Sequence, residues 1–303
     1  MTATPDAIVT ALRTLAGPHE GARPTFAKGL CVRGTFTPDP RAGEVIASRT
    51  FAETSALIGR FSVGGGNPGV ADTNKLVLRG FAFRCGPEGS TSDFITESAP
   101  VHFARTLDQM LAFLRVRALG PGGQPDAEAI KAFSAANPET THQAAFVATR
   151  PLPASFAGVE YWAVHAFPVT DLRGEQRLVK FKVVPVHGVE SLDEATAAAR
   201  PPGFLADDLR ARIDAGTAAF DLVAILGRPG DPTADVTRRW VDEDERETAR
   251  LGRIDVTALE PAATCDAFAF DPSRLCAGIG HPSDEIFAAR VKAYPISLSR
   301  RRA

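Results

Sequence analysis

The sequence lacks the features that are typical of a membrane protein, a nucleic-acid-binding protein or a secreted protein. No apolar run approaches the roughly 18 residues that a helix needs to span a bilayer. The formal net charge of -2 gives neither the basic field that attracts nucleic acid nor the acidic excess of a disordered chain. The first apolar stretch contains Asp6 and Arg13, which is not typical of a secretory signal. We therefore expect a cytoplasmic protein without a membrane or nucleic-acid partner.

Cysteine is also scarce. The chain has 4 cysteines, Cys31, Cys85, Cys265 and Cys276, and none of them forms a CxxC pair. This spacing does not favour a structural zinc site. In a reducing compartment, the pattern predicts four free thiols that are mostly buried.

What is present is typical of a folded α+β protein. Hydrophobic residues make up 44% of the 303 residues, and no repeat or linker forces a division into two domains. Helical spacing predicts helices over 5–16, over 106–118 with a Thr106 cap, and over 283–294 with a Ser283 cap. Apolar or alternating runs predict strands over 29–36, 76–84, 159–169, 178–186 and 219–226. We therefore expect an antiparallel sheet that can close into a barrel, with helices towards the chain ends.

Other segments are expected to be irregular or exposed. Residues 60–73 (RFSVGGGNPGVADT) are too glycine-rich for a regular element, and they lack the GK[ST] ending of a phosphate-binding loop. Residues 121–125 read as a Gly/Pro-rich connector, and residues 171–176 (DLRGEQ) as the turn of an antiparallel hairpin. Residues 242–250 (DEDERETAR) are most simply a solvated, charged helix face.

Four groups of short motifs lie in order along nearly the whole chain. They are RPTFAKG at 23–29, RFSVGGGNP at 60–68 with RGFA at 79–82, SAPVHFAR at 98–105, and FDP at 270–272 with RVKAY at 290–294. In this order and spacing the chain resembles the catalase superfamily, and in particular its compact branch, the catalase-related peroxidases.

The resemblance implies one catalase-like domain over residues 1–303, an α+β antiparallel β-barrel with surrounding helices and a deeply buried heme b. It implies that Tyr294 binds the heme iron. The sequence stops soon after Tyr294, so the C-terminal additions of larger catalases are not expected. The substrate implied is a small peroxide or another small molecule, and the resemblance is compatible with a homo-oligomer.

The implied ligand role of Tyr294 agrees with the chemistry of its neighbours. A phenol ionises near pH 10, yet an iron ligand must be a phenolate. Arg290 lies four residues before Tyr294 on the predicted helix, so both side chains share one face. A guanidinium that donates a hydrogen bond to the phenolate favours the ionised form.

Heme also carries two propionates, which need cationic partners. The resemblance assigns this role to Arg23 and Arg60, with Arg301 as a weaker third, and it makes Ser62 a candidate heme contact. Arginine suits the task because its planar fork matches a carboxylate.

The chain departs from the family at the residues that move protons. The residue before Ala-Lys-Gly is the distal histidine in the family and is Phe26 here, and the matching asparagine falls on Glu97. General acid–base help in proton transfer contributes typically 10²–10⁴-fold, and a phenyl ring supplies none. We therefore expect hydrogen peroxide dismutation to be lost or severely reduced.

Two ionisable residues of the same region are candidates for the missing acid–base group. Glu97 is an acid in a site expected to be apolar, where burial raises a carboxyl pKa towards useful values. His102 falls on a pocket-lining position of the family, and either residue can equally be structural. The remaining histidines are expected to be structural: His19, His142, His165, His187 and His281.

Three functional hypotheses follow. The first is a heme-dependent oxidoreductase of the catalase-related peroxidase type, which acts on organic hydroperoxides with little or no hydrogen peroxide dismutation. The second is a heme-dependent isomerase or dehydratase that rearranges a hydroperoxide without net oxidation. The third, which Phe26 favours, is a heme-binding homologue without turnover.

Overall fold

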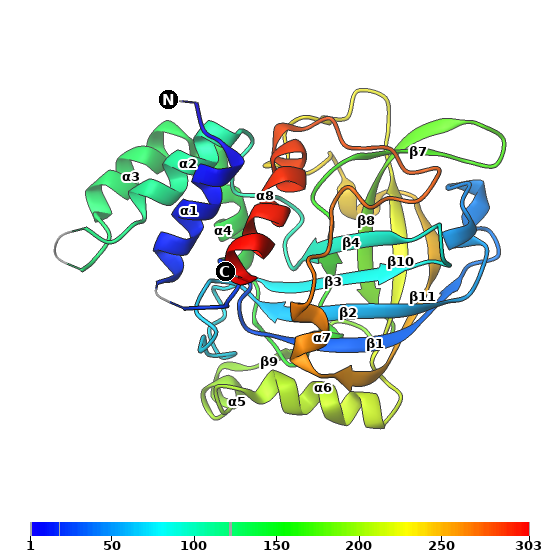
Figure 1. Cartoon of the computed structure of the whole chain (residues 1–303), viewed down its shortest axis with the longest axis horizontal. Coiled ribbons are helices and arrows are strands. Elements are labelled where there is room, and N and C mark those ends of the chain that lie inside the picture. Colours follow the sequence, from blue (N-terminus) through cyan, green and yellow to red (C-terminus); the bar gives the residue numbers. More distant parts are fainter. Residues whose placement is uncertain (1, 18, 121–122, 303) are drawn as a thin grey trace.

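The computed structural model describes residues 2–17, 19–120 and 123–302, and its centre is a closed antiparallel β-barrel (Figure 1). The strand order is β10-β11-β1-β2-β3-β4-β6-β8, the β8–β10 pairing closes the barrel, and β7 extends the sheet beside β8. Each strand of this sheet runs antiparallel to the strands with which it pairs, so the predicted α+β fold with an antiparallel barrel is confirmed. The strands are β1 Gly29–Pro38, β2 Ser55–Val63, β3 Arg79–Cys85, β4 Ser92–Glu97, β6 Tyr161–Trp162, β7 Phe167–Thr170, β8 Gln176–Pro185, β10 Ala219–Leu226 and β11 Thr248–Glu260.

The barrel interior is filled by aromatic side chains. Phe61 and Phe81 stack with ring centroids 4.2 Å apart, and Phe220 packs 5.4 Å from Phe81. These rings point inward because successive strand residues face opposite sides of the sheet, so apolar residues at alternate positions share the core. The barrel is therefore a packed support for a site at its edge rather than a container for a ligand.

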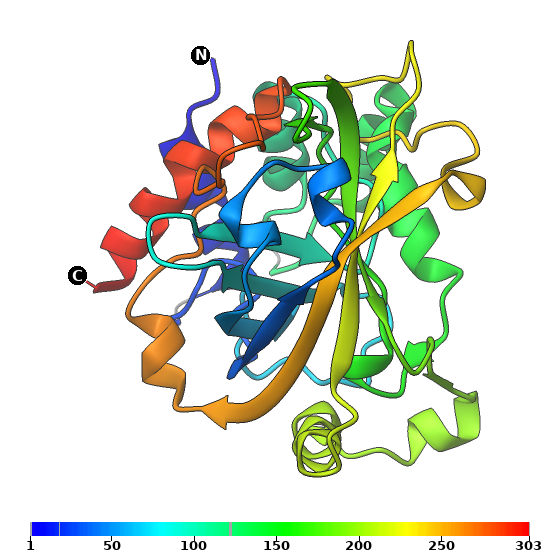
Figure 2. The ribbon, with the colours of Figure 1, turned by 90° about the vertical axis from the view of Figure 1, so that its right-hand side faces the viewer.

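Helices surround the barrel, and three of them gather on one side of it. Figure 2 shows α8 (red) beside the N-terminal helix α1 (blue). Their apolar faces and that of α2 meet in one cluster that includes Ile8, Leu111 and Ala289. The helices are α1 Pro5–Ala16, α2 Leu107–Val116, α3 Ala127–Ala136, α4 His142–Ala148, α5 Glu194–Ala198, α6 Phe204–Asp214, α7 Ala262–Asp266 and α8 Glu285–Arg302. A short sheet pairs β5 Leu152–Pro153 with β9 Ser191–Leu192. In the described ranges, no helix combines the length and apolarity needed to cross a membrane.

The ends of the predicted helices follow their capping chemistry with one exception. Thr106 caps α2 by accepting a hydrogen bond from the Gln109 amide, as predicted. The helix predicted from Ser283 begins instead at Glu285, because Asp284 accepts the amide hydrogen of Phe287 and performs the capping. The prediction of a Ser283 cap was therefore wrong.

Several predicted boundaries need correction. The strand predicted over 159–169 is divided into β6 and β7, whereas the hairpin between β7 and β8 is confirmed. Residues 60–63 form the end of β2 despite the glycines that follow, and the strand predicted from residue 76 begins at Arg79. Of the predicted connector over 121–125, residues 121–122 lie outside the described residues.

The prediction of four free cysteines was wrong. Cys31 in β1 and Cys265 in α7 form a disulfide with a Cα–Cα distance of 5.7 Å, whereas Cys85 and Cys276 are free and buried. The two bonded residues are 234 positions apart in the sequence, so only the fold brings them together. The disulfide joins α7 to the barrel wall.

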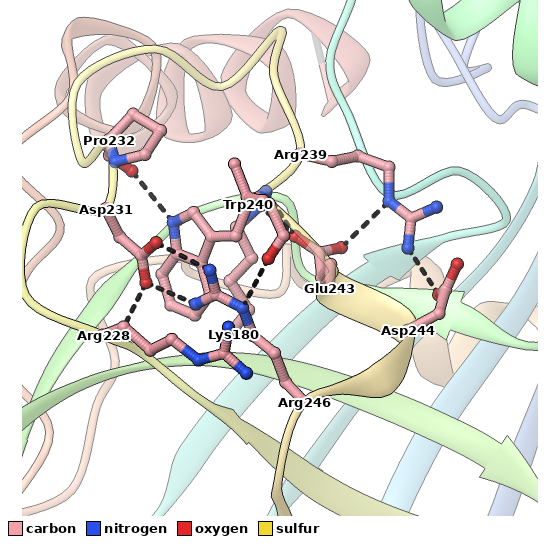
Figure 3. Close-up of polar contacts among 10 residues, drawn as sticks. Lys180, Arg228, Asp231, Pro232, Arg239, Trp240, Glu243, Asp244 and Arg246 are labelled. Carbon is pink, nitrogen blue, oxygen red and sulfur yellow. Dashed lines mark hydrogen bonds and ion pairs between the residues drawn. The ribbon is translucent and has the colours of Figure 1, made fainter.

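The charged segment 242–250 is also not a solvated helix. It contains a short 3-10 turn, Glu243–Glu245, and the start of β11. Glu243 is buried and accepts a 2.7 Å hydrogen bond from Lys180 of β8. Arg246 donates two hydrogen bonds to the carboxylate of Asp231 (Figure 3). Lys180 and Arg246 each lie 5.0 Å from the centre of the Trp240 ring. These contacts fix the segment before β11 to the barrel.

Glu243→Gln is expected to lower the free energy of unfolding by about 3 kcal/mol, because it leaves the buried Lys180 cation without a carboxylate. Urea denaturation measures the change. Asp244→Asn is the control, because it removes the partner of Arg239 at an exposed position and should cost less than about 1 kcal/mol. Equal losses in the two variants would contradict this account of the segment.

Candidate functional site

One cavity of about 460 Å³ lies between the barrel edge and the helices α1, α2, α4 and α8. Its walls are mainly apolar. All nine residues that the sequence nominated for the site lie along it, namely Arg23, Phe26, Arg60, Ser62, Glu97, His102, Arg290, Tyr294 and Arg301. Motifs from the two ends of the chain therefore meet in one place.

The register of the sheet explains part of this wall. Ser62 pairs with Gly80, Gly80 with Glu97, and Glu97 with Trp162, on four successive strands. Directly opposed residues of antiparallel strands direct their side chains to the same face of the sheet. The row consequently directs the Ser62 hydroxyl, the Glu97 carboxyl and the Trp162 indole towards the cavity, and Gly80 leaves a space between the first two.

Tyr294 is held by a chain of polar side chains that starts from the buried residues Asp284 and His165. Arg290 donates to the Tyr294 hydroxyl at 2.9 Å, and its other terminal nitrogen lies 2.8 Å from His165 Nε2. His165 Nδ1 lies 2.8 Å from a carboxylate oxygen of Asp284. Because a carboxylate only accepts, Nδ1 carries the proton and Nε2 accepts from Arg290. Asp284 orients His165, and His165 in turn orients the Arg290 guanidinium towards the Tyr294 hydroxyl.

The charges in this chain are consistent with that arrangement. Burial lowers the pKa of His165, which keeps the imidazole neutral. Although burial opposes it, the hydrogen bond from His165 helps to hold the pKa of Asp284 below its usual value. Burial also opposes the charge of Arg290, but Tyr294 and the nearby carboxylates raise the pKa of this guanidinium. His165 was expected to be structural, and the contact it makes to Arg290 could not be read from the sequence.

A cluster of three arginines lies at another part of the cavity. Arg23 and Arg301 both contact Asp266 of α7, and Arg23 also donates to the Cys265 carbonyl at 2.8 Å. Burial, followed by repulsion from Arg23, lowers the pKa of Arg60 to about 9, and burial likewise lowers the pKa of Arg301 to about 10. Arg301 Nε is buried without a hydrogen-bond partner among the described residues. The three guanidinium groups share the single carboxylate of Asp266, so the cluster carries an excess of positive charge.

Phe26 takes a strained backbone conformation at the cavity wall. Its φ of 52° is uncommon for a residue with a side chain. Arg60 donates to the Phe26 carbonyl at 2.9 Å and to the Ala27 carbonyl at 2.8 Å, which holds the turn. A Cβ at Gly80 would lie 3.1 Å from the Phe26 ring, so the glycine provides the space that the ring occupies.

Glu97 and His102 differ in the protonation that burial imposes on them. Burial raises the pKa of Glu97 to about 7, against the opposing influence of Arg290 and of a hydrogen bond from Gln143. Burial lowers the pKa of His102 to about 4, so its ring is neutral at neutral pH. His102 Nδ1 also lies 2.9 Å from the Ala104 carbonyl, within its own loop. Glu97 is therefore the group of this wall that can exchange a proton near pH 7.

One wall of the site contains none of the residues predicted from the sequence. Thr140, Gln143, Ala144 and Val147 all line the cavity, from the 3-10 turn Pro138–Thr141 and from α4. The last three residues follow the first by three, four and seven positions, which is the spacing of one helix face. This spacing was the sequence signal that could have predicted a helix on this wall. Gln143 is the polar member that contacts a predicted site residue, since it donates to Glu97 at 2.7 Å.

A phenol held by an arginine, a separate arginine cluster and a cavity beside a closed antiparallel barrel agree with the catalase-like domain that the motifs suggested. Comparison with known proteins supports the resemblance that the motifs suggested. The family profile described as "Catalase" matches residues 20–302. The chain therefore belongs to the catalase family.

Two bacterial relatives have a length similar to that of this chain. The chain is 31% identical to a catalase-related peroxidase of Synechococcus elongatus over 98% of this chain and 88% of that protein. It is also 31% identical to a catalase-related peroxidase of Mycolicibacterium paratuberculosis, over 98% and 95% respectively.

Solved structures show the same fold. A fungal catalase superposes with a TM-score of 0.81 at 23% identity, covering 92% of this chain and 59% of that structure. Catalase A from Saccharomyces cerevisiae gives a TM-score of 0.80 at 22% identity, covering 92% of this chain and 61% of that structure. The chain thus spans about three fifths of the length of these larger catalases.

Proposed function

We propose that this chain, over residues 1–303, is one heme domain that reduces organic hydroperoxides and dismutates hydrogen peroxide weakly or not at all. The observation that carries the proposal is the carboxyl of Glu97, whose pKa is raised to about 7 by burial and which lines the same cavity as Phe26 and the Arg290–Tyr294 pair. The family supports a peroxidase or catalase type of chemistry, and these residues favour the peroxidase type.

The residues present fit a heme b. Tyr294 would bind the iron, with Arg290 donating to its oxygen and favouring the phenolate. Arg23, Arg60 and Arg301 would bind the two propionates, which supply the negative charge that their cluster lacks. Ser62, on the same wall, is available as a further contact. The bound heme would supply the redox chemistry of the peroxide bond.

Glu97 is proposed to handle the proton of the substrate. As a carboxylate it accepts the proton from the hydroperoxide oxygen, and it returns that proton to the oxygen that leaves as an alcohol. The second oxygen leaves as water, with two electrons and two protons supplied by an organic reductant. Phe26 takes no part in the proton transfer and restricts the water beside the carboxyl.

The walls favour an organic rather than an inorganic peroxide. Leu12, Met110 and Phe113 line the side formed by α1 and α2, and Val147 and Trp162 line the side near Glu97. An alkyl or aryl group gains free energy by leaving water for such walls, whereas hydrogen peroxide has no apolar part to bury.

The purified, heme-loaded protein is expected to oxidise a reducing dye with cumene hydroperoxide and to release little oxygen from hydrogen peroxide. A dye assay and an oxygen electrode measure the two activities. Phe26→His, which restores an imidazole at this position, is expected to increase oxygen release by about 10²-fold or more.

Oxygen release by the unmodified protein at ordinary catalase rates would contradict the proposal. Conversion of the hydroperoxide without oxidation of the dye would replace it with an isomerase or dehydratase. Bound heme without either activity would indicate a non-catalytic homologue.

A further inference from the structure

Glu97 is held by a residue that lies outside the motifs. Gln143 of α4 is only 8% exposed, and its Nε2 donates to Glu97 Oε1 at 2.7 Å. The same nitrogen donates to the Val101 carbonyl at 2.8 Å. Gln143 therefore joins the end of β4 to the loop that follows it, and both Gln143 and Glu97 line the cavity.

The contact to Val101 determines what Gln143 can offer to Glu97. A backbone carbonyl only accepts, so the amide must turn its NH₂ group towards Val101. The two hydrogens of Nε2 are then both used, one on Val101 and one on Glu97. In this orientation Gln143 donates to the Glu97 carboxyl and does not accept its proton.

A fixed donor has two consequences for the carboxyl. It stabilises the ionised form, because a hydrogen bond to a carboxylate is stronger than one to a neutral acid. It also occupies Oε1, whereas no hydrogen bond to Oε2 of Glu97 is formed within the described ranges. The second oxygen is thus the one available to a substrate proton.

The other groups around Glu97 do not duplicate this role. Arg290 of α8 acts on the carboxyl through its charge, and no hydrogen bond joins the two side chains in the described structure. His102, in the loop after β4, is neutral near pH 7, and Trp162 is the cross-strand neighbour of Glu97. Gln143 is the direct donor.

We infer that Gln143 is a positioning residue, which keeps Glu97 in the form that accepts a proton and directs its free oxygen into the cavity. The catalytic consequence rests on the proposed function, because it requires Glu97 to take the proton of a hydroperoxide. The positioning role does not rest on the proposed function, because the effect of Gln143 on the ionisation of the Glu97 carboxyl can be measured without any turnover.

The test is a measurement of the pKa of Glu97 in the heme-loaded protein. Infrared spectroscopy reports it through the carboxyl band of Glu97, which is identified by its loss in Glu97→Gln. Gln143→Met keeps the length of the side chain and removes the donor, so the pKa is expected to rise by about one unit, a tenfold change in the ionisation equilibrium. The pH profile of kcat/KM should move upward with it. Gln109→Met is the matched control, since Gln109 is 9% exposed but bonds Asn137 and Glu139 instead, and it should leave the band unchanged.

An unchanged Glu97 pKa in Gln143→Met would overturn the inference even if hydroperoxide turnover persists. A shifted pKa in a protein without turnover would sustain the positioning role and reject the proposed function instead. Gln143→Glu provides a second variant should the methionine variant not fold. Its added carboxyl should raise the pKa of Glu97 further by repulsion, and no rise would also overturn the inference.

Discussion

Tyr294→Phe is expected to abolish iron ligation by phenolate and to lower hydroperoxide turnover by about 100-fold or more. The phenyl ring keeps the packing but has no oxygen for the iron, and Arg290 loses the hydroxyl to which it donates. Electron paramagnetic resonance and the visible spectrum report the ligand, and the dye assay reports turnover. We expect both to change together.

The second tyrosine of the chain provides the control for this experiment. Tyr161 is buried in the barrel and donates to the Phe156 carbonyl at 2.8 Å, away from Arg290. Tyr161→Phe should therefore retain the phenolate spectrum, although it leaves the Phe156 carbonyl without this donor. A Tyr294→Phe protein with an unaltered spectrum would show that another residue binds the iron.

Glu97→Gln is expected to lower hydroperoxide turnover by about 10²–10⁴-fold, because glutamine cannot accept the proton. The pH dependence gives a second signature. Burial raises the pKa of Glu97 to about 7, so the carboxylate fraction, and with it the activity of the unmodified protein, should rise as the pH rises through 7. This rise should be missing in Glu97→Gln. Rates measured from pH 5 to about pH 9 test both statements.

His102→Phe separates the two candidate groups. Because burial lowers the pKa of His102 to about 4, its neutral ring has no ionisation near pH 7 that could produce this profile. The variant should keep the inflection near pH 7, even where removal of the ring changes the shape of the cavity. Loss of the inflection in His102→Phe, with its retention in Glu97→Gln, would transfer the acid–base role to the histidine.

Local sequence patterns predicted the parts of the fold that depend on local chemistry. The helices α1 and α2 carry their own caps and apolar stripes, and β10 is a run of apolar residues interrupted by Asp221. The strands β2, β4 and β11 were missed, because their glycines and charges obscure any simple period. In β11 the segment before the strand looks like an exposed charged helix, yet Glu243 is buried because Lys180, 63 residues earlier, neutralises it. No local pattern contains that partner.

The candidate site shows the same division. Motif resemblance nominated nine residues, and the fold brings all of them to one cavity, although their catalytic and binding roles remain predictions. The residues that orient them were not found. His165 is 125 positions from Arg290, and Gln143 is 46 positions from Glu97, so each contact exists only after the barrel has closed. The disulfide between Cys31 and Cys265 was missed for the same reason.

The most direct test of the account is a crystal structure of the protein loaded with hemin. We predict that the Tyr294 oxygen is bonded to the iron, that Arg23 and Arg60 reach the propionates, and that Phe26 and Glu97 face the opposite side of the ring. A heme held by another residue, or a cavity between α8 and the barrel edge that admits no porphyrin, would contradict it.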